Sequence, residues 1–197
     1  MIKKCILLSF LVAGLGLMSL SAHAGWTLDS ERSSLHFVSI KNGTTAEVHS
    51  FAELKGTVGD DGKVSLDVHL DSVDTNIAIR DERMREMLFE TEKMPTATVT
   101  AQIDVASVLQ MSEGSVGSKD IRLTLSLHGQ EQGFDTAMKI IKLANGGVAV
   151  STEQPLLVEA KTFGMAEGVD ALREIAGLSS IAVAVPVTVN LVFQVAD

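Results

Sequence analysis

Residues 64–105 read VSLDVHLDSVDTNIAIRDERMREMLFETEKMPTATVTAQIDV. Residues 64–70 alternate apolar and polar side chains, and residues 96–105 do the same. This alternation has the period of a β-strand with one buried face. Between the two runs lies a block dense in Arg, Asp and Glu, residues 72–95. The sequence therefore predicts two strands joined by a segment of a different kind.

The charged block predicts a connecting helix that begins at Ile77. Asn76 or Asp74 is placed to cap this helix, and Pro95 prevents it from continuing into the next strand. One face of the helix would carry the apolar residues Ile77, Met84, Met87 and Leu88. The favourable charge pairs at helical spacing are Asp81–Arg85, Glu82–Arg85 and Arg83–Glu86. We interpret the charges as a solvated helix face rather than as a catalytic cluster.

The rest of the chain repeats the strand pattern. Further alternating runs cover residues 121–127, 134–141 and 181–195. Turn signals between strands are Asp60-Asp61-Gly62, His128-Gly129-Gln130-Glu131 and Asn145-Gly146-Gly147. Residues 168–178 have helical spacing and end at a capping Gly177, and Pro186 implies a bend or an edge position in the last strand. Short strands without crossover helices predict an all-β meander, closed into a barrel or folded into a sandwich.

The N-terminus predicts a secretory signal peptide over residues 1–24. Lys3 and Lys4 precede an apolar run over residues 6–20, and Ala22-His23-Ala24 offers a cleavage site after Ala24. The run is short for a transmembrane helix, so we expect no stable membrane insertion. The single cysteine, Cys5, lies in this leader, so no disulfide is expected. Residues 25–197 contain no repeat or linker and suit one domain.

Charge and motifs exclude several classes of function. The chain has 25 acidic residues against 16 basic ones, a formal net charge of −9, which argues against nucleic acid or an anionic membrane surface as a partner. The histidines after the leader, His36, His49, His69 and His128, are scattered singly, so no metal site is expected. No nucleophile elbow, phosphate loop or zinc-protease motif is present. We therefore expect no enzyme activity and no cofactor.

The order of landmarks around the charged block resembles a known family. Ser72-Val73-Asp74-Thr75-Asn76, Arg80-Asp81, Phe89 and Pro95 resemble the signature of the YceI-like, polyisoprenoid-binding periplasmic proteins. Residues 33–37 resemble the first strand of that family, Phe51 and Gly56 its second, and residues 123–129 and Phe163-Gly164 two later elements. The chain departs from the family pattern at Arg32, Lys41, Ile77, Leu88 and Val99.

The resemblance implies a fold. It is a lipocalin-like antiparallel β-barrel of about eight strands, with a short helix between two central strands and a second short helix before the last strand. The barrel would surround an elongated apolar tunnel, since eight strands leave just enough room for a ligand. The resemblance also implies a periplasmic location, and long isoprenoid chains, including quinone and polyprenyl lipids, or fatty amides as ligands.

Our leading hypothesis is a non-enzymatic carrier for an isoprenoid or other long-chain amphiphile. Arg80 and Asp81 are expected to fasten the connecting helix to the barrel rather than to contact lipid. The alternative is a protein-interaction module of the cell envelope with a solid core and no ligand. As a protein partner of the carrier we consider a second copy of the chain, in a homodimer. The predicted ligand-binding residues are Phe37, Phe51, Leu66, Val68, Val99, Ile103, Leu123, Leu125, Val187 and Phe193.

Overall fold

The computed structural model describes residues 24–196, so the predicted signal peptide lies outside the described residues except for Ala24. The strands are β1 (Ala24–Leu28), β2 (Ser34–Lys41), β3 (Thr45–Phe51), β4 (Leu54–Gly59), β5 (Lys63–His69), β6 (Val73–Asp74), β7 (Thr96–Gln102), β8 (Val116–Leu127), β9 (Gln130–Lys142), β10 (Val148–Thr152), β11 (Leu156–Glu159) and β12 (Ala184–Val195). The helices are α1 (Ala78–Arg83), α2 (Val105–Leu109) and α3 (Ala166–Ile175). A π-helical turn, Met84–Leu88, continues α1.

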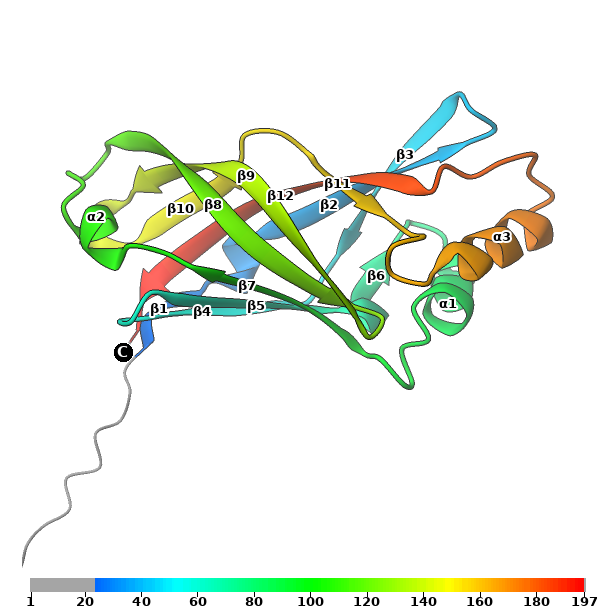
Figure 1. Cartoon of the computed structure of the whole chain (residues 1–197), viewed down its shortest axis with the longest axis horizontal. Helices are drawn as coiled ribbons and strands as arrows, with labels where there is room; N and C mark the ends of the chain where they lie inside the picture. Colours follow the sequence, from blue (N-terminus) through cyan, green and yellow to red (C-terminus); the bar gives the residue numbers. More distant parts are fainter. Residues whose placement is uncertain (1–23, 197) are drawn as a thin grey trace, which may run out of the picture.

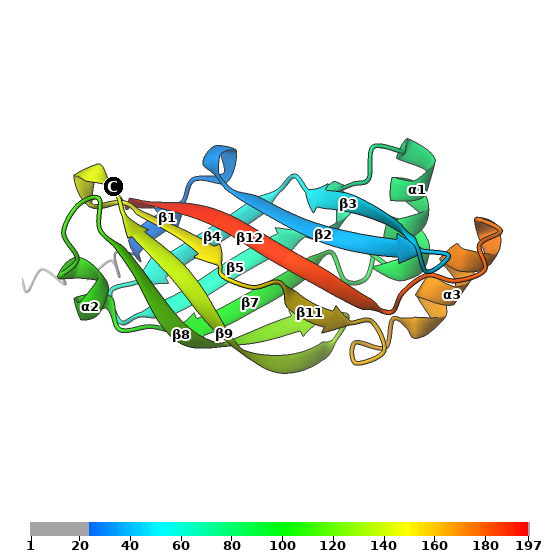
Figure 2. The same ribbon diagram turned by 90° about the horizontal axis from the view of Figure 1, so that it is seen from above.

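Antiparallel pairing closes the strands into a barrel. The order is β1-β4-β5-β7-β8-β9-β10-β12, and β12 pairs with β1 to complete a ring of eight strands within residues 24–196. The first half of β12 lies outside this ring and pairs with β2 and β11 instead of β1 and β10. Strand β3 then pairs with β2, and β6 pairs with β3. Figures 1 and 2 show an elongated barrel with α2 at one end and α1 and α3 at the other. The predicted fold class is confirmed.

The two strands that flank the charged block are direct neighbours. In β5 and β7, Val64 pairs with Ala101 and His69 pairs with Thr96. The predicted continuation of this second strand to Val105 is wrong, because β7 ends at Gln102 and α2 begins at Val105. Asp104 ends the extended run, since its carboxylate accepts a hydrogen bond from the Ser107 amide and caps α2.

The turn and bend predictions agree with the structure. His128 and Gly129 both have positive φ, at 52° and 73°, and join β8 to β9 in a two-residue hairpin. The chain bulges just before and at Pro186, because residues 182–186 face only residues 38–40 between the pairs Ile181–Lys41 and Val187–Phe37. The regular strand therefore begins at Ala184 rather than at Ile181.

Helix α1 begins at Ala78, one residue after the predicted start, and neither predicted residue caps it. Ile77 stands at its N-cap without a side-chain bond, and Asp74 accepts a hydrogen bond from the Asn76 amide instead. None of the three predicted charge pairs lies within ion-pair distance in the part of the chain that the structure describes. One of the residues involved, Arg85, donates to the carbonyl of Asp71.

A polar clamp, Thr75 with Arg80 and Asp81, fastens α1 to the barrel. The amide and hydroxyl of Thr75 both donate to the Asp81 carboxylate. Arg80 donates through Nε to the Thr75 hydroxyl at 2.8 Å and through Nη2 to the Thr75 carbonyl at 2.7 Å, while Nη1 donates to Glu47 of β3 at 2.6 Å. Thr75 is only 2% exposed. Arg80 and Asp81 therefore hold the helix, as expected, although they meet through Thr75 rather than with each other.

Helix α3 closes the same end of the barrel by packing against the π-helical turn. A Cβ on Gly168 would lie 2.6 Å from the Met87 carbonyl oxygen and 3.0 Å from the Leu88 Cα, so only glycine allows this approach. Phe163, fully buried, anchors the loop that leads into α3. Gly177 follows the end of the helix at φ 63°, as its predicted capping role requires. No helix among residues 24–196 is long and apolar enough to cross a membrane.

We expect Thr75→Val to lower the free energy of unfolding by about 2 to 3 kcal/mol, because Asp81 loses a donor and Arg80 loses an acceptor in a buried site. Urea unfolding at neutral pH measures this loss. Thr27→Val is the matched control, since Thr27 is an exposed residue of β1, and it should change stability by less than about 0.5 kcal/mol. Equal effects of the two substitutions would contradict the clamp.

We also expect Gly168→Ala to destabilise the protein by about 1 to 3 kcal/mol, because the added methyl group must displace backbone atoms of the π-helical turn. The direction of the stability change is informative, since Gly→Ala inside an ordinary helix stabilises it by about 1 kcal/mol. Glu174→Ala, at an exposed position of α3, serves as the control. Thermal or urea unfolding in which Gly168→Ala raises stability would rule out the close packing.

Candidate functional site

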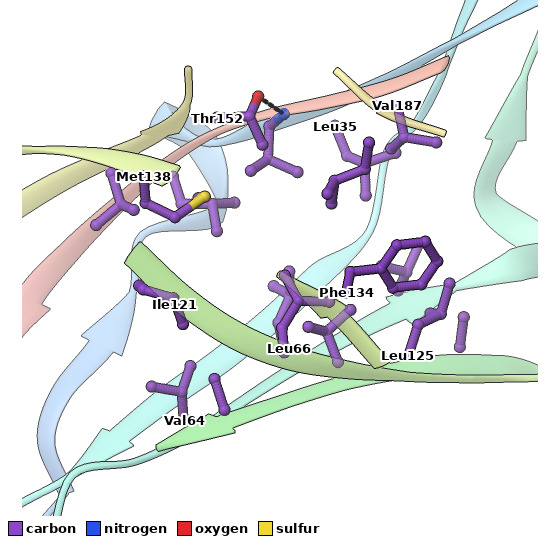
Figure 3. A pocket seen from close by; sticks show the side chains of 18 of the residues that line it. Leu35, Val64, Leu66, Ile121, Leu125, Phe134, Met138, Thr152 and Val187 are labelled. Atoms are coloured by element: carbon purple, nitrogen blue, oxygen red, sulfur yellow. Dashed lines mark hydrogen bonds between the residues drawn. The ribbon is translucent and has the colours of Figure 1, made fainter. Parts of the chain in front are cut away.

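An apolar cavity of about 440 Å³ occupies the interior of the barrel. Its volume lies within the range of roughly 300 to 1,000 Å³ that is typical of small-molecule sites. Figure 3 shows aliphatic side chains from several strands, among them Leu35, Leu66, Ile121 and Val187, directed into the space between them. The cavity therefore has the character of a site for an apolar molecule.

Strand alternation builds the wall of the cavity. In β8 the residues Ile121, Leu123, Leu125 and Leu127 line it, while the residues between them point outward. Lining residues of β8 extend from Lys119 to Leu127, which at about 3.3 Å per residue corresponds to roughly 26 Å along the strand. One leaflet of a bilayer has a hydrocarbon depth of about 15 Å, half of the ~30 Å core. The wall is long enough for an extended chain.

All ten predicted ligand-binding residues lie at the cavity wall. That they contact a ligand stays a prediction. Other lining residues were missed by sequence reasoning, among them Trp26, Phe134, Met138, Met165 and Val169. The alternating run over residues 134–141 held the signal for Phe134 and Met138. Met165 and Val169 belong to the loop and helix that close the barrel, where no period distinguishes a cavity residue from a core residue.

The cavity meets solvent at a mouth where polar residues gather. The exposed lining residues are Gln102, Asp104, Lys119 and Asp120. Ser107 of α2 lies beside them, and Thr152, deeper in the wall, is hydrogen-bonded through its hydroxyl to the Val189 amide at 3.3 Å (Figure 3). All other lining residues are apolar. The polar groups of the site are therefore concentrated where it meets solvent.

A break in the β7–β8 ladder creates this mouth. These strands pair only from Thr98 with Ser126 to Ala101 with Leu123. Strand β8 continues back to Val116, paired with β9 alone, because the chain leaves β7 at Gln102 to form α2. Helix α2 contributes Val108 to the cavity and borders the gap.

The opposite end of the cavity is closed by aromatic side chains. The Phe51 ring lies 5.3 Å from the Phe37 ring and 5.7 Å from the Phe89 ring, measured between centroids. Leu88, Met165 and Val169 complete this end. Of the departures from the family pattern, Leu88 and Val99 lie in the wall, whereas Ile77 is 48% exposed and does not line the cavity.

A polar layer lies beyond the aromatic end, on the inward face of β2 and β3. His49 packs against Phe37 and shares a hydrogen bond of 2.8 Å with Ser39, and its Nδ1 has no partner among the described residues. Burial, and then the nearby Arg80, lower the pKa of His49, so the ring is neutral near pH 7. Hydrogen bonds from Lys41 and Arg80 hold the pKa of Glu47 below its usual range. The closed end therefore carries paired charges outside the cavity and none inside it.

In the part of the chain that the structure describes, no three His, Cys, Asp or Glu side chains are placed to hold a metal ion. His49 lies at the closed end of the barrel, far from the aspartates of the mouth. Of these aspartates, Asp104 caps α2. The geometry suits binding of an apolar chain.

Comparison with known proteins gives the same fold. The chain is similar to a polyisoprenoid binding domain from Saccharophagus degradans implicated in plant cell wall breakdown, at 35% identity and a TM-score of 0.86, over 87% of this chain and 99% of that one. Two further structures share the fold at low identity. BcnA of Burkholderia cenocepacia is 14% identical (TM-score 0.66; 84% and 98% covered), and a YCEI protein of Campylobacter jejuni is 16% identical (TM-score 0.51; 76% and 84% covered). No curated protein matches the chain.

The match to a family is more extensive than any local motif. Residues 26–193 match the YceI-like domain, which is nearly all of the part that the structure describes. The landmarks Thr75, Arg80 and Asp81 have a structural role, since they form the clamp that fastens α1. Together, the extent of the match and the closed barrel settle the family: the chain belongs to the YceI-like family.

Proposed function

We propose that this protein is a non-enzymatic carrier that binds an isoprenoid, such as a polyprenyl lipid or an isoprenoid quinone, or another long-chain amphiphile. The observation that carries the proposal is the long apolar cavity inside a closed barrel, with a single polar side chain, Thr152, away from its mouth. An isoprenoid chain gains about 0.8 kcal/mol for each methylene-sized group withdrawn from water. The similarity to a polyisoprenoid binding domain at 35% identity supports the proposal.

The periplasm is the compartment that we propose for this carrier. The predicted signal peptide over residues 1–24 supports export, and the lack of cysteine in residues 25–197 makes the fold independent of redox conditions. A lipid chain that crosses an aqueous compartment needs shielding from water. The alternative, an interaction module of the cell envelope, requires a solid core and is less consistent with a cavity of about 440 Å³.

Lipid extraction tests the function directly. The protein is purified from the periplasm of its own cells, and the extract is analysed by mass spectrometry for amphiphiles. A prenyl quinone is then added to delipidated protein, and the melting temperature is measured, since a ligand that binds only the folded state raises it. Absence of any co-purifying amphiphile together with an unchanged melting temperature would refute the carrier.

A substitution that fills the cavity should remove binding. Ala101 lines the cavity in β7, so Ala101→Phe places a ring in the path of the chain, and we expect at least about tenfold weaker binding, or ~1.4 kcal/mol. Trp26, the only tryptophan, lines the same cavity and reports binding by its fluorescence during titration with decylubiquinone. Thr100→Phe is the matched control, because Thr100 is the exposed neighbour that points outward. Equal affinities of the two variants would place the ligand elsewhere.

A further inference from the structure

The inward face of β8 ends in a lysine at the mouth. Lys119 is in phase with Ile121, Leu123, Leu125 and Leu127, so it continues the apolar wall to the solvent. Its ammonium group has no ion-pair or hydrogen-bond partner among residues 24–196. Lys119 is thus a free donor placed at the point where a bound chain would leave the cavity.

The other polar groups of the mouth are mostly committed to the fold. Asp104 caps α2, and the Ser107 hydroxyl donates to the Asp104 carbonyl at 2.8 Å. The Gln102 amide nitrogen donates to the Asp61 carbonyl at 2.7 Å. Asp120, beside Lys119, is exposed. Lys119 is therefore the donor most accessible to a ligand.

The closed end of the cavity has no place for a polar head. Leu88, Phe89, Met165 and Val169 surround it, and the hydrogen-bonding groups of His49 lie behind Phe37 and do not line the cavity. Burial of a polar group without a hydrogen bond costs several kcal/mol on transfer scales, roughly 2 to 7. An amphiphile therefore lies with its tail toward Phe89 and its head at the mouth.

Charge at the mouth favours a head without net charge. The lining residues include one lysine and two aspartates, Asp104 and Asp120. Another lysine of this end, Lys142, is buried, donates to the Gly146 carbonyl at 3.0 Å and lies over the Trp26 ring, so it does not line the cavity. A diphosphate head would meet two carboxylates for one free ammonium group on a chain of net charge −9.

We propose that the mouth between β7, α2 and β8 is a headgroup site, in which Lys119 donates a hydrogen bond to an oxygen of an uncharged head such as an alcohol or a quinone. The inference rests on the proposed function, because it takes the ligand to be a long-chain amphiphile. It adds the orientation of the ligand, the residue that contacts the head and the charge class of the head.

Affinity measurements test the contact and the charge class. Geranylgeraniol and geranylgeranyl diphosphate share one chain and differ in the head, and Trp26 fluorescence reports the binding of each. We expect the alcohol to bind at least about tenfold more tightly, and Lys119→Ala to weaken alcohol binding about fivefold. Lys139→Ala is the matched control, since Lys139 is an exposed lysine of β9 outside the cavity, and it should change affinity less than about twofold.

Spin-labelled probes test the orientation. Methyl stearate carrying a nitroxide near its ester or near its tail end is bound, and reduction of the nitroxide by aqueous ascorbate is followed by electron paramagnetic resonance. The label near the ester should be reduced faster. Faster reduction of the tail label, unchanged alcohol affinity in Lys119→Ala, or tighter binding of the diphosphate would each overturn the headgroup site. A lack of binding by all probes would instead refute the carrier function itself.

Discussion

Strand β12 pairs with β1 through Leu28 and Phe193 on one side and with β10 through Val150 and Leu191 on the other, and these two ladders close the barrel. Closure satisfies the backbone groups of both outer strands, so the wall does not depend on a packed interior to hide a free edge. The interior can then remain open. A β-sandwich built from the same alternating strands would have to fill this space, because its two sheets cohere through the side chains between them.

The positions of the mouth and of the closed end follow from where the ladders stop. Strand β7 is shorter than its neighbour β8, and the missing length becomes the gap beside α2. At the other end the long connection between β5 and β7 folds back as α1 and the π-helical turn, and α3 covers it through the close approach at Gly168. The clamp at Thr75 makes this cover part of the barrel, because Arg80 joins the helix to β3 through Glu47. One end is thus sealed by packing and the other is left to polar side chains.

Sequence alternation predicted much of the fold and less of the local detail. The alternating runs around Val64, Val99 and Leu123 form the adjacent strands β5, β7 and β8. Each run has one apolar face that must be buried, and this requirement leaves few ways to pair the strands. It did not distinguish a barrel from a sandwich, because both have one buried face, and only the family resemblance made that choice. Helix α2 was missed because Ile103 and Val105 fit the strand period. The strand nevertheless ends before them, since Asp104 caps the helix. The predicted cap of α1 was wrong because the acidic side chain that bonds near the start of the helix comes from within it. Asp81 accepts a hydrogen bond from the Thr75 amide, a contact that depends on the tertiary position of both residues.

The departures from the family pattern have a different meaning in the structure than in the sequence. Ile77 is a surface residue, so its lack of polarity does not alter the cavity, whereas Leu88 and Val99 place apolar side chains in the wall. The polar groups that would contact the head of a ligand must therefore lie elsewhere on the wall. Lys119 satisfies that condition, and its position was visible in the sequence, two residues before Ile121 and in phase with it. A charged residue that continues an inward apolar series marks the place where a barrel wall reaches water, and in this chain it does so on the side where the ladder is open.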